Sequence, residues 1–224
     1  MFYNTFNDNV SKRRRDMPKG TPELTANRRS EIINACEKLY ETMSFKDITF
    51  GEISKETSFS RPSIYNYFET KEEIFLALMQ REYDIWNTDL RRITDENDAL
   101  TDDELAGELA HSLENRPQLL KLLSMNHYDM EEHSRPESLT EFKKSYGESL
   151  EAVRDCLKKF RPYMTEDERE RFILVFFPFM FGIYPYTAAT EKQLTAMKEA
   201  GVKFTKCSVY KIIYNCIRKI LGDR

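Results

Sequence analysis

Apolar residues recur at helical spacing along most of this chain. The first clear run begins at Thr25, where Ile32, Cys36, Leu39 and Met43 follow one another at intervals of three or four residues. Charged side chains fill the positions between them. Because this spacing places one apolar stripe on one side of a helix, it predicts an amphipathic helix that begins at Thr25.

Polar capping residues predict where the next helices begin. Thr49 precedes a short helix over residues 50–57, with Glu52 three residues later as a capping-box partner. Thr70 precedes a long helix that reaches about Leu90, with acidic residues in its first turn, where the helix dipole favours them.

Between these two helices, Ser60 is a good N-cap for another short helix over residues 61–67. Pro62 lies in its first turn, where a missing backbone N–H costs nothing.

The remainder of the chain is also predicted to be helical. Proline and glycine separate the segments, and no stretch alternates like a β-strand. The expected fold class is therefore all-α, with further helices over residues 102–113, 117–132, 136–160, 166–187, 190–200 and 207–221.

The two short helices are joined by the tight link Ser58-Phe59-Ser60, which makes them a candidate helix-turn-helix. In such a motif the second helix enters the DNA major groove. The run from Ile48 to Leu78, ITFGEISKETSFSRPSIYNYFETKEEIFLAL, resembles the DNA-binding region of the tetracycline-repressor (TetR) family of bacterial regulators. The segment Ile64-Tyr65-Asn66-Tyr67-Phe68 carries the most characteristic part of this resemblance.

The turn departs from the family pattern. The family usually has Ala-Gly-Val-Ser where this chain has Thr57-Ser58-Phe59-Ser60. Glycine tolerates a positive φ, so a serine there must adopt a less favourable backbone or a slightly different turn.

The resemblance implies a three-helix DNA-binding domain followed by a helical domain that dimerises and binds a small inducer. We accordingly expect a flexible basic arm over residues 1–24, a helix-turn-helix domain over 25–86, and a dimerisation and ligand-binding domain over 87–224.

Side-chain chemistry assigns expected roles on the recognition helix. The Arg61 guanidinium can bond O6 and N7 of guanine, and Pro62 can meet a thymine methyl. The resemblance implies phosphate contacts for Thr49, Tyr67 and Lys71. The full expected DNA-binding set is Thr49, Ser60, Arg61, Pro62, Ser63, Tyr65, Asn66, Tyr67 and Lys71.

The charge distribution adds a feature that the total conceals. The chain has 34 Lys+Arg against 38 Asp+Glu, a formal net charge of −4. Residues 1–71 contain 12 basic and 10 acidic side chains, and Lys12 to Arg15 concentrate the excess in the arm. This arm is either a solubilising tail or a clamp on phosphates or the minor groove.

Aromatic residues crowd one C-terminal segment, with seven of them between Phe172 and Tyr186 against 28 in the whole chain. A helix that is apolar nearly all round must be buried, either as core and dimer interface or as the wall of a pocket for an apolar or aromatic compound. The last helix is the natural partner in a four-helix dimer interface. The candidate pocket residues are Phe176, Phe177, Met180, Phe181 and Tyr184.

Other chemistry finds little support. His127 and Glu131 share a helix face, but His133 is displaced from it and no third ligand is specified, so no metal or other cofactor is expected. No nucleophile elbow accompanies the Ser, His and Asp residues, so no enzymatic activity is expected. No membrane span or signal peptide is evident, and the cytoplasm is the expected location.

The sequence thus predicts a homodimeric DNA-binding regulator, a repressor that leaves a roughly palindromic operator when a small molecule binds. One alternative is a ligand-independent or activating regulator of the same fold. The other is a helical small-molecule-binding protein or enzyme in which the first seventy residues are only an interaction module.

Overall fold

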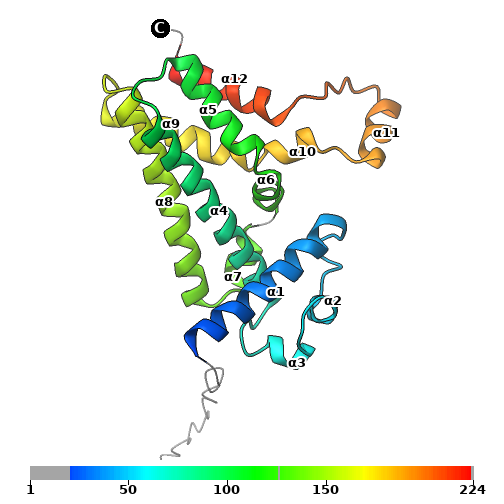
Figure 1. Ribbon diagram of the computed structural model, residues 1–224. Helices are drawn as coiled ribbons and strands as arrows, with labels where there is room; N and C mark the ends of the chain where they lie inside the picture. Colours follow the sequence, from blue (N-terminus) through cyan, green and yellow to red (C-terminus); the bar gives the residue numbers. More distant parts are fainter. Residues whose placement is uncertain (1–20, 126, 223–224) are drawn as a thin grey trace, which may run out of the picture. The chain divides into compact units, whose positions relative to one another are not determined.

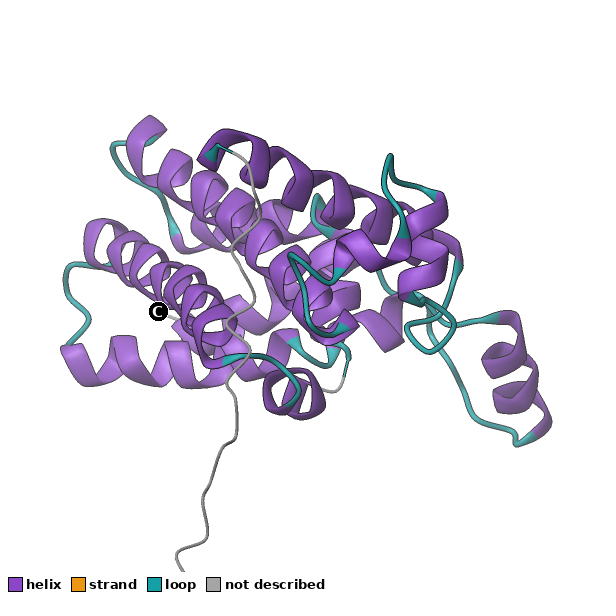
Figure 2. Cartoon of the chain, turned by 90° about the horizontal axis from the view of Figure 1, so that it is seen from below, coloured by secondary structure: helices purple, strands orange, loops and turns teal. Residues whose placement is uncertain are grey.

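The computed structural model describes residues 21–125 and 127–222, and helices are the only regular elements in that part of the chain (Figures 1 and 2). The chain divides into two compact units, residues 1–69 and 70–224. The all-α fold class is confirmed. The predicted basic arm lies outside the described residues, apart from its last four positions.

The first unit contains α1 (Pro22–Thr42), α2 (Phe50–Lys55) and α3 (Arg61–Ile64). Helix α1 begins three residues before the predicted Thr25, because the Thr21 hydroxyl accepts the Leu24 N–H at 3.2 Å and Pro22 occupies the first turn. Pro22 thus begins this helix. The side chains that α1–α3 and the following turn bury together include Ile32, Cys36, Ile48, Ile53, Ile64 and Phe68.

Helix α3 is shorter than the predicted 61–67, but the chain keeps turning after it. The Asn66 N–H donates to the Ser63 carbonyl at 3.2 Å, and the Tyr67 N–H donates to the Ile64 carbonyl at 2.9 Å. These i→i+3 bonds tighten the end of the helix. Residues 65–67 therefore form a tight turn in place of a further α-helical turn.

The second unit is built on two long helices, α4 (Lys71–Glu96) and α8 (Pro136–Phe160), which pack against each other over much of their length. Helix α5 packs against α12 in the same unit (Figure 1). None of the described helices is long and apolar enough to cross a membrane. The remaining helices are α5 (Asp102–Glu114), α6 (Pro117–Leu123), α7 (His127–Glu132), α9 (Glu166–Met180), α10 (Ile183–Thr187), α11 (Glu191–Glu199) and α12 (Val209–Leu221).

A buried amide fixes how α4 and α8 align. The Asn87 side-chain N–H group donates to the Ser145 carbonyl at 3.0 Å, and the Ser149 hydroxyl donates to the Asn87 oxygen at 2.6 Å. Both Asn87 and Ser149 are buried. Because an unsatisfied buried amide is costly, any other alignment of the two helices is disfavoured.

An ion pair joins the first turns of the same two helices. The Glu73 carboxylate accepts from the Arg135 backbone N–H at 2.9 Å and from two guanidinium nitrogens at 2.6 and 2.9 Å. The Glu73 side chain is fully buried, whereas Arg135 remains partly exposed. Three donors compensate the buried charge of Glu73.

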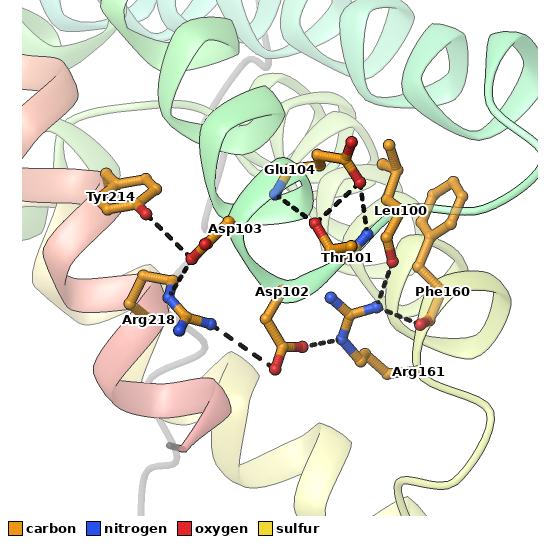
Figure 3. A network of polar contacts seen from close by, with 9 residues as sticks. All are labelled: Leu100, Thr101, Asp102, Asp103, Glu104, Phe160, Arg161, Tyr214 and Arg218. Atoms are coloured by element: carbon orange, nitrogen blue, oxygen red, sulfur yellow. Dashed lines mark hydrogen bonds and ion pairs between the residues drawn. The ribbon is translucent and has the colours of Figure 1, made fainter. Parts of the chain in front are cut away.

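A second polar network lies at the start of α5 (Figure 3). Asp103 accepts from the Arg218 Nε at 2.8 Å and from the Tyr214 hydroxyl at 3.1 Å, and this bond raises the pKa of Tyr214. Asp102 pairs with Arg161, which is buried and also donates to the Leu100 carbonyl at 2.8 Å. The network ties α12 and the end of α8 to the first turn of α5.

Two predicted helices are each divided in the structure. The segment 166–187 forms α9 and α10, because Pro178 lacks an N–H and the Gly182 N–H donates only as far back as the Phe179 carbonyl, at 3.1 Å. The segment 117–132 forms α6 and α7. Helix α6 ends where the Ser124 hydroxyl donates to the Lys121 carbonyl at 2.7 Å.

The Asn87 amide allows a direct test of the α4–α8 alignment. Asn87→Ala should lower the free energy of unfolding by about 1–3 kcal/mol, because it removes both hydrogen bonds of the buried amide between the helices and leaves the Ser149 hydroxyl only its bond to the Ser145 carbonyl within α8, at 3.1 Å. Urea denaturation measures this change. Thr88→Ala, at a neighbouring exposed position, is the control, and an equal loss in both variants would contradict the assigned role.

Candidate nucleic-acid interface and effector cavity

Helix α3 and the turn after it expose most of the side chains that the sequence assigned to DNA on this segment. Arg61, Pro62, Tyr65 and Asn66 are exposed, and Ser63 is half-buried. The Tyr65 ring packs against Phe50 of α2, with ring centroids 4.7 Å apart, which leaves its hydroxyl at the surface. The apolar residues between them hold the helix to the core of the unit.

Two arginines of α1 hold the turn that follows α3. Arg28 donates to the Tyr67 hydroxyl at 3.2 Å, and Arg29 donates to the Tyr67 carbonyl at 3.1 Å. The Arg29 guanidinium also lies 4.5 Å from the centre of the Phe68 ring, a cation–π contact. Tyr67 is therefore buried, and it presents its hydroxyl to a cation of the first helix.

A carboxylate of α1 stabilises the turn that lacks the family glycine. Glu31 accepts the Ser58 backbone N–H at 2.5 Å, and the Thr57 hydroxyl lies 3.3 Å from the Phe59 carbonyl. No non-glycine residue among the described ones has a positive φ, so Ser58 adopts an ordinary backbone conformation. Ser58 therefore takes the place of the family glycine without a left-handed backbone, and Glu31 of α1 provides the acceptor for its N–H.

The capping residues behave differently from one another. Thr49 caps α2 by accepting the Glu52 N–H at 3.2 Å, but the Glu52 carboxylate pairs with Lys55, so only half of the predicted capping box forms. Ser60 begins α3 without a side-chain cap, since its hydroxyl lies 3.1 Å from that of Ser63. The hydroxyls of Ser60 and Ser63 thus form a pair at the start of the recognition helix.

Two ion pairs lie on the surface of the first unit. Lys38 lies 2.5 Å from Glu56, which raises the pKa of the Lys38 amine, and Lys55 lies 2.7 Å from Glu52. Within residues 21–69 no carboxylate pairs with Arg61. Arg61 is thus a cation at the exposed start of α3, available to an anionic partner.

Lys71 and the helix it begins belong to the second unit. Thr70 caps this helix as predicted, because its hydroxyl accepts the Glu73 N–H at 3.2 Å, and it also donates to the His133 carbonyl at 2.9 Å. Lys71 is half-buried and follows directly after this cap.

The sequence did not single out Arg28, Arg29 or Glu31, which it placed on the polar face of the first helix. Their partners lie 27 to 39 residues away in the chain. No local pattern encodes such contacts, although two adjacent arginines on a helix that precedes an aromatic-rich turn are compatible with them.

A cavity of about 340 Å³ lies in the second unit. Pro117 and Leu120 of α6, Tyr184 of α10 and Val209 of α12 provide apolar walls, and Lys206 adds a cation. A mostly apolar wall with few polar groups is typical of a small-molecule site.

The aromatic candidates of α9 and α10 are divided between core and cavity. Phe176, Phe177 and Met180 are buried, and Phe177 packs with ring centroids 5.9 Å from Trp86 and 5.8 Å from Tyr146. Tyr184 lines the cavity.

Phe181 packs 4.7 Å from the His127 ring. Burial lowers the pKa of His127, and its Nε2 donates to the Leu123 carbonyl at 3.0 Å. Among the described residues, no group of three or more His, Cys, Asp or Glu side chains is arranged to hold a metal ion.

Family comparison agrees with this arrangement of elements. Residues 32–78 match the family model of the bacterial regulatory proteins of the tetR family, and residues 80–209 match the tetracyclin repressor-like C-terminal domain. The chain belongs to the TetR family. It is a helix-turn-helix transcriptional regulator, and the family resemblance inferred from the sequence is confirmed.

Individual relatives extend the TetR-family comparison. The chain is 31% identical over 67 residues to the uncharacterized helix-turn-helix transcriptional regulator YfiR of Bacillus subtilis, a match that covers 30% of this chain and 33% of that protein. The chain thus spans about a third of the length of this curated relative.

Solved structures of TetR-family proteins share the fold. A TetR transcriptional regulator from Rhodococcus sp. RHA1 superimposes with a TM-score of 0.55 at 12% identity, over 90% of this chain and 98% of that one. The repressor FadR of Thermus thermophilus, solved in complex with lauroyl-CoA, superimposes with a TM-score of 0.55 at 17% identity, over 86% and 93% of the two chains.

The contact between Glu31 and Ser58 gives a test of the turn. Glu31→Ala should destabilise the first unit by about 1 kcal/mol, since it removes a charged acceptor from a backbone N–H at a partly exposed site. Hydrogen exchange of the Ser58 amide should become faster. Glu41→Ala removes the same charge from an exposed position of α1 and should leave this amide unchanged. An unaltered exchange rate in Glu31→Ala would contradict the proposed turn support.

Proposed function

We propose that this TetR-family protein is a repressor that binds a roughly palindromic operator as a homodimer. The observation that carries the DNA-binding part is the exposed edge formed by α3 and the turn after it, where Arg61 and Pro62 of the helix and Tyr65 and Asn66 of the turn are exposed over the buried Ile64. The set proposed to contact DNA is Thr49, Ser60, Arg61, Pro62, Ser63, Tyr65, Asn66, Tyr67 and Lys71.

Arg61 is proposed to read a base, and the other members position the helix on phosphates or bases. Arg28 is proposed to contact DNA together with Tyr67, because its guanidinium donates to the Tyr67 hydroxyl. Arg28 is then a cation of the interface in addition to Arg61. This role for Arg28 extends the set predicted from the sequence. The cytoplasm is the proposed place of action.

The homodimer is proposed to form through the C-terminal helices. Leu174 and Val175 of α9 and Tyr186 of α10 are 70%, 50% and 64% exposed, which makes an apolar surface along these helices. An exposed surface of this kind indicates a protein contact, and a second copy completes a four-helix arrangement with α12. Two-fold symmetry then presents two recognition helices to a palindrome.

The effector is proposed to be a small apolar or aromatic molecule. Tyr184, together with Pro117, Leu120 and Val209, lines the cavity that supports this proposal. Four other residues predicted for the site do not line the cavity, and they remain proposed members of the site as a packed layer behind it. They are Phe176, Phe177, Met180 and Phe181. A ligand releases the operator if it binds better to a conformer whose recognition helices are spaced wrongly for DNA.

Substitution of α3 tests DNA recognition on a fragment carrying the promoter next to the protein's own gene. Arg61→Ala should weaken binding by about 1–3 kcal/mol, measured by gel shift at fixed salt. Tyr65→Phe keeps the ring that packs on Phe50 and should weaken binding further through the lost hydroxyl.

Lys55→Ala is the matched control, because it removes one positive charge that already pairs with Glu52. If Arg61→Ala combined with Tyr65→Phe binds the fragment like the unmodified protein, α3 is not the recognition helix.

The cavity can be tested with lauroyl-CoA, the ligand found with FadR of Thermus thermophilus, because its apolar acyl chain is the kind of group proposed for the cavity. We expect lauroyl-CoA to lower the affinity for the promoter fragment, and Leu120→Trp to abolish this effect by filling the cavity. Release that persists in Leu120→Trp would show that the cavity is not the effector site. Absence of release in the unmodified protein would exclude acyl-CoA as the effector class.

A further inference from the structure

A long excursion separates α10 from α12. Residues 188–208 leave the helical body after α10, carry α11, and return to the start of α12 (Figure 1). Within the described part of the chain no residue of α11 is buried. We call residues 188–208 the arm, which is a different segment from the basic arm predicted over residues 1–24.

Both ends of α11 are fully capped. Thr190 and Gln193 form a complete capping box at its start. At its end Gly201 has a φ of +67°, the Val202 N–H donates to the Met197 carbonyl at 2.9 Å, and the Gly201 N–H donates to the Lys198 carbonyl at 3.2 Å. This pair of bonds is a Schellman motif.

A helix of nine residues is marginal in water, and most helices are stabilised by burying one face. The arm has such a face. Leu194 and Met197 lie three residues apart on one side of α11, and Val202, which follows the Schellman turn, is 56% exposed. A well-capped helix with an apolar side and no buried residue has the features of an element that is completed by a partner.

A groove suited to the arm lies at the opposite end of the same helical layer. It has a volume of about 310 Å³, and its walls include Tyr163, Met164, Ile220 and Leu221. Tyr163 is 52% exposed. The groove is formed where α9 begins and α12 ends, whereas the arm departs where α10 ends and α12 begins.

The direction of the helices determines whether the arm of one copy can reach the groove of a second copy. Helices α9 and α10 lead toward the arm, and α12 returns in the opposite direction (Figure 1). The exposed Leu174, Val175 and Tyr186 lie between groove and arm along the chain. A two-fold axis through this surface turns the second copy end for end, so that its groove meets the arm of the first.

We propose that the arm of each copy docks on the second copy, with Leu194, Met197 and Val202 over the groove formed by the start of α9 and the end of α12. This inference rests on the proposed homodimer and adds a reciprocal exchange to it.

Charge favours the same pairing. The arm contains four lysines and two glutamates, namely Lys192, Lys198, Lys203, Lys206, Glu191 and Glu199. Residues 166–171 contain four carboxylates and two arginines, of which Glu168 and Arg171 line the groove. A basic arm is thus matched to an acidic first stretch of α9, which steers association and orients the contact.

The apolar side of α11 can be changed at little cost to the folded monomer, because Leu194 and Met197 are only partly buried there. Leu194→Asp combined with Met197→Asp should raise the dimer dissociation constant by about tenfold or more, measured by analytical ultracentrifugation. Its matched control, Ala196→Asp, adds an aspartate on the far side of α11 and should have a much smaller effect.

Cross-linking tests the position of the arm. In a background of Cys207→Ser and Cys216→Ser, one preparation carries Val202→Cys and a second carries Tyr163→Cys. After the two are mixed to exchange subunits, a short bismaleimide should yield covalent dimers. Neither preparation should do so alone, because one position is on the arm and the other at the groove of the partner.

The possible outcomes separate this inference from the function on which it rests. A stable dimer that neither cross-links nor responds to the α11 substitutions overturns the docking of the arm and leaves the homodimer intact. An unmodified protein that is monomeric at all concentrations overturns both. Promoter binding is measured in a separate experiment, so neither the cross-linking result nor the oligomeric state determines whether the protein binds DNA.

Discussion

The alignment of α4 with α8 is the constraint on which the second unit depends. Helix α4 carries the two largest fully buried side chains, Trp86 and Tyr83. Apolar contacts alone permit several sliding positions of similar energy, whereas the Asn87 amide can satisfy both its donor and its acceptor in only one. The position of α9 against Trp86, and with it the aromatic layer beside the cavity, follows from this one alignment.

The cavity proposed for the effector and the arm share a segment of chain. Lys206 near the end of the arm and Val209 at the start of α12 both line the cavity. A molecule that fills the cavity therefore acts on the attachment point of the arm. If the arm contacts a second copy, occupation of the cavity and the geometry of the dimer are energetically linked through these few residues, and such a link acts equally in both directions.

The sequence could predict what local interactions determine. Helical periodicity and the caps at Thr49 and Thr70 located most helices, because both signals involve residues within one or two turns. The exposed face of α3 was predictable for the same reason. The contacts of Arg28 and Glu31 were not, since their partners are brought close only by folding. The aromatic count could not separate core from cavity, because both environments select the same apolar side chains.

The carboxylate that supports the Ser58 turn makes a local structure depend on a remote one. A glycine turn can close as soon as its own residues sample a left-handed conformation. Here the acceptor of the Ser58 N–H is Glu31, on a helix 27 residues earlier in the chain. The turn thus has its full stability only when α1 is folded and docked, so the stability of the turn before the recognition helix is coupled to that of α1.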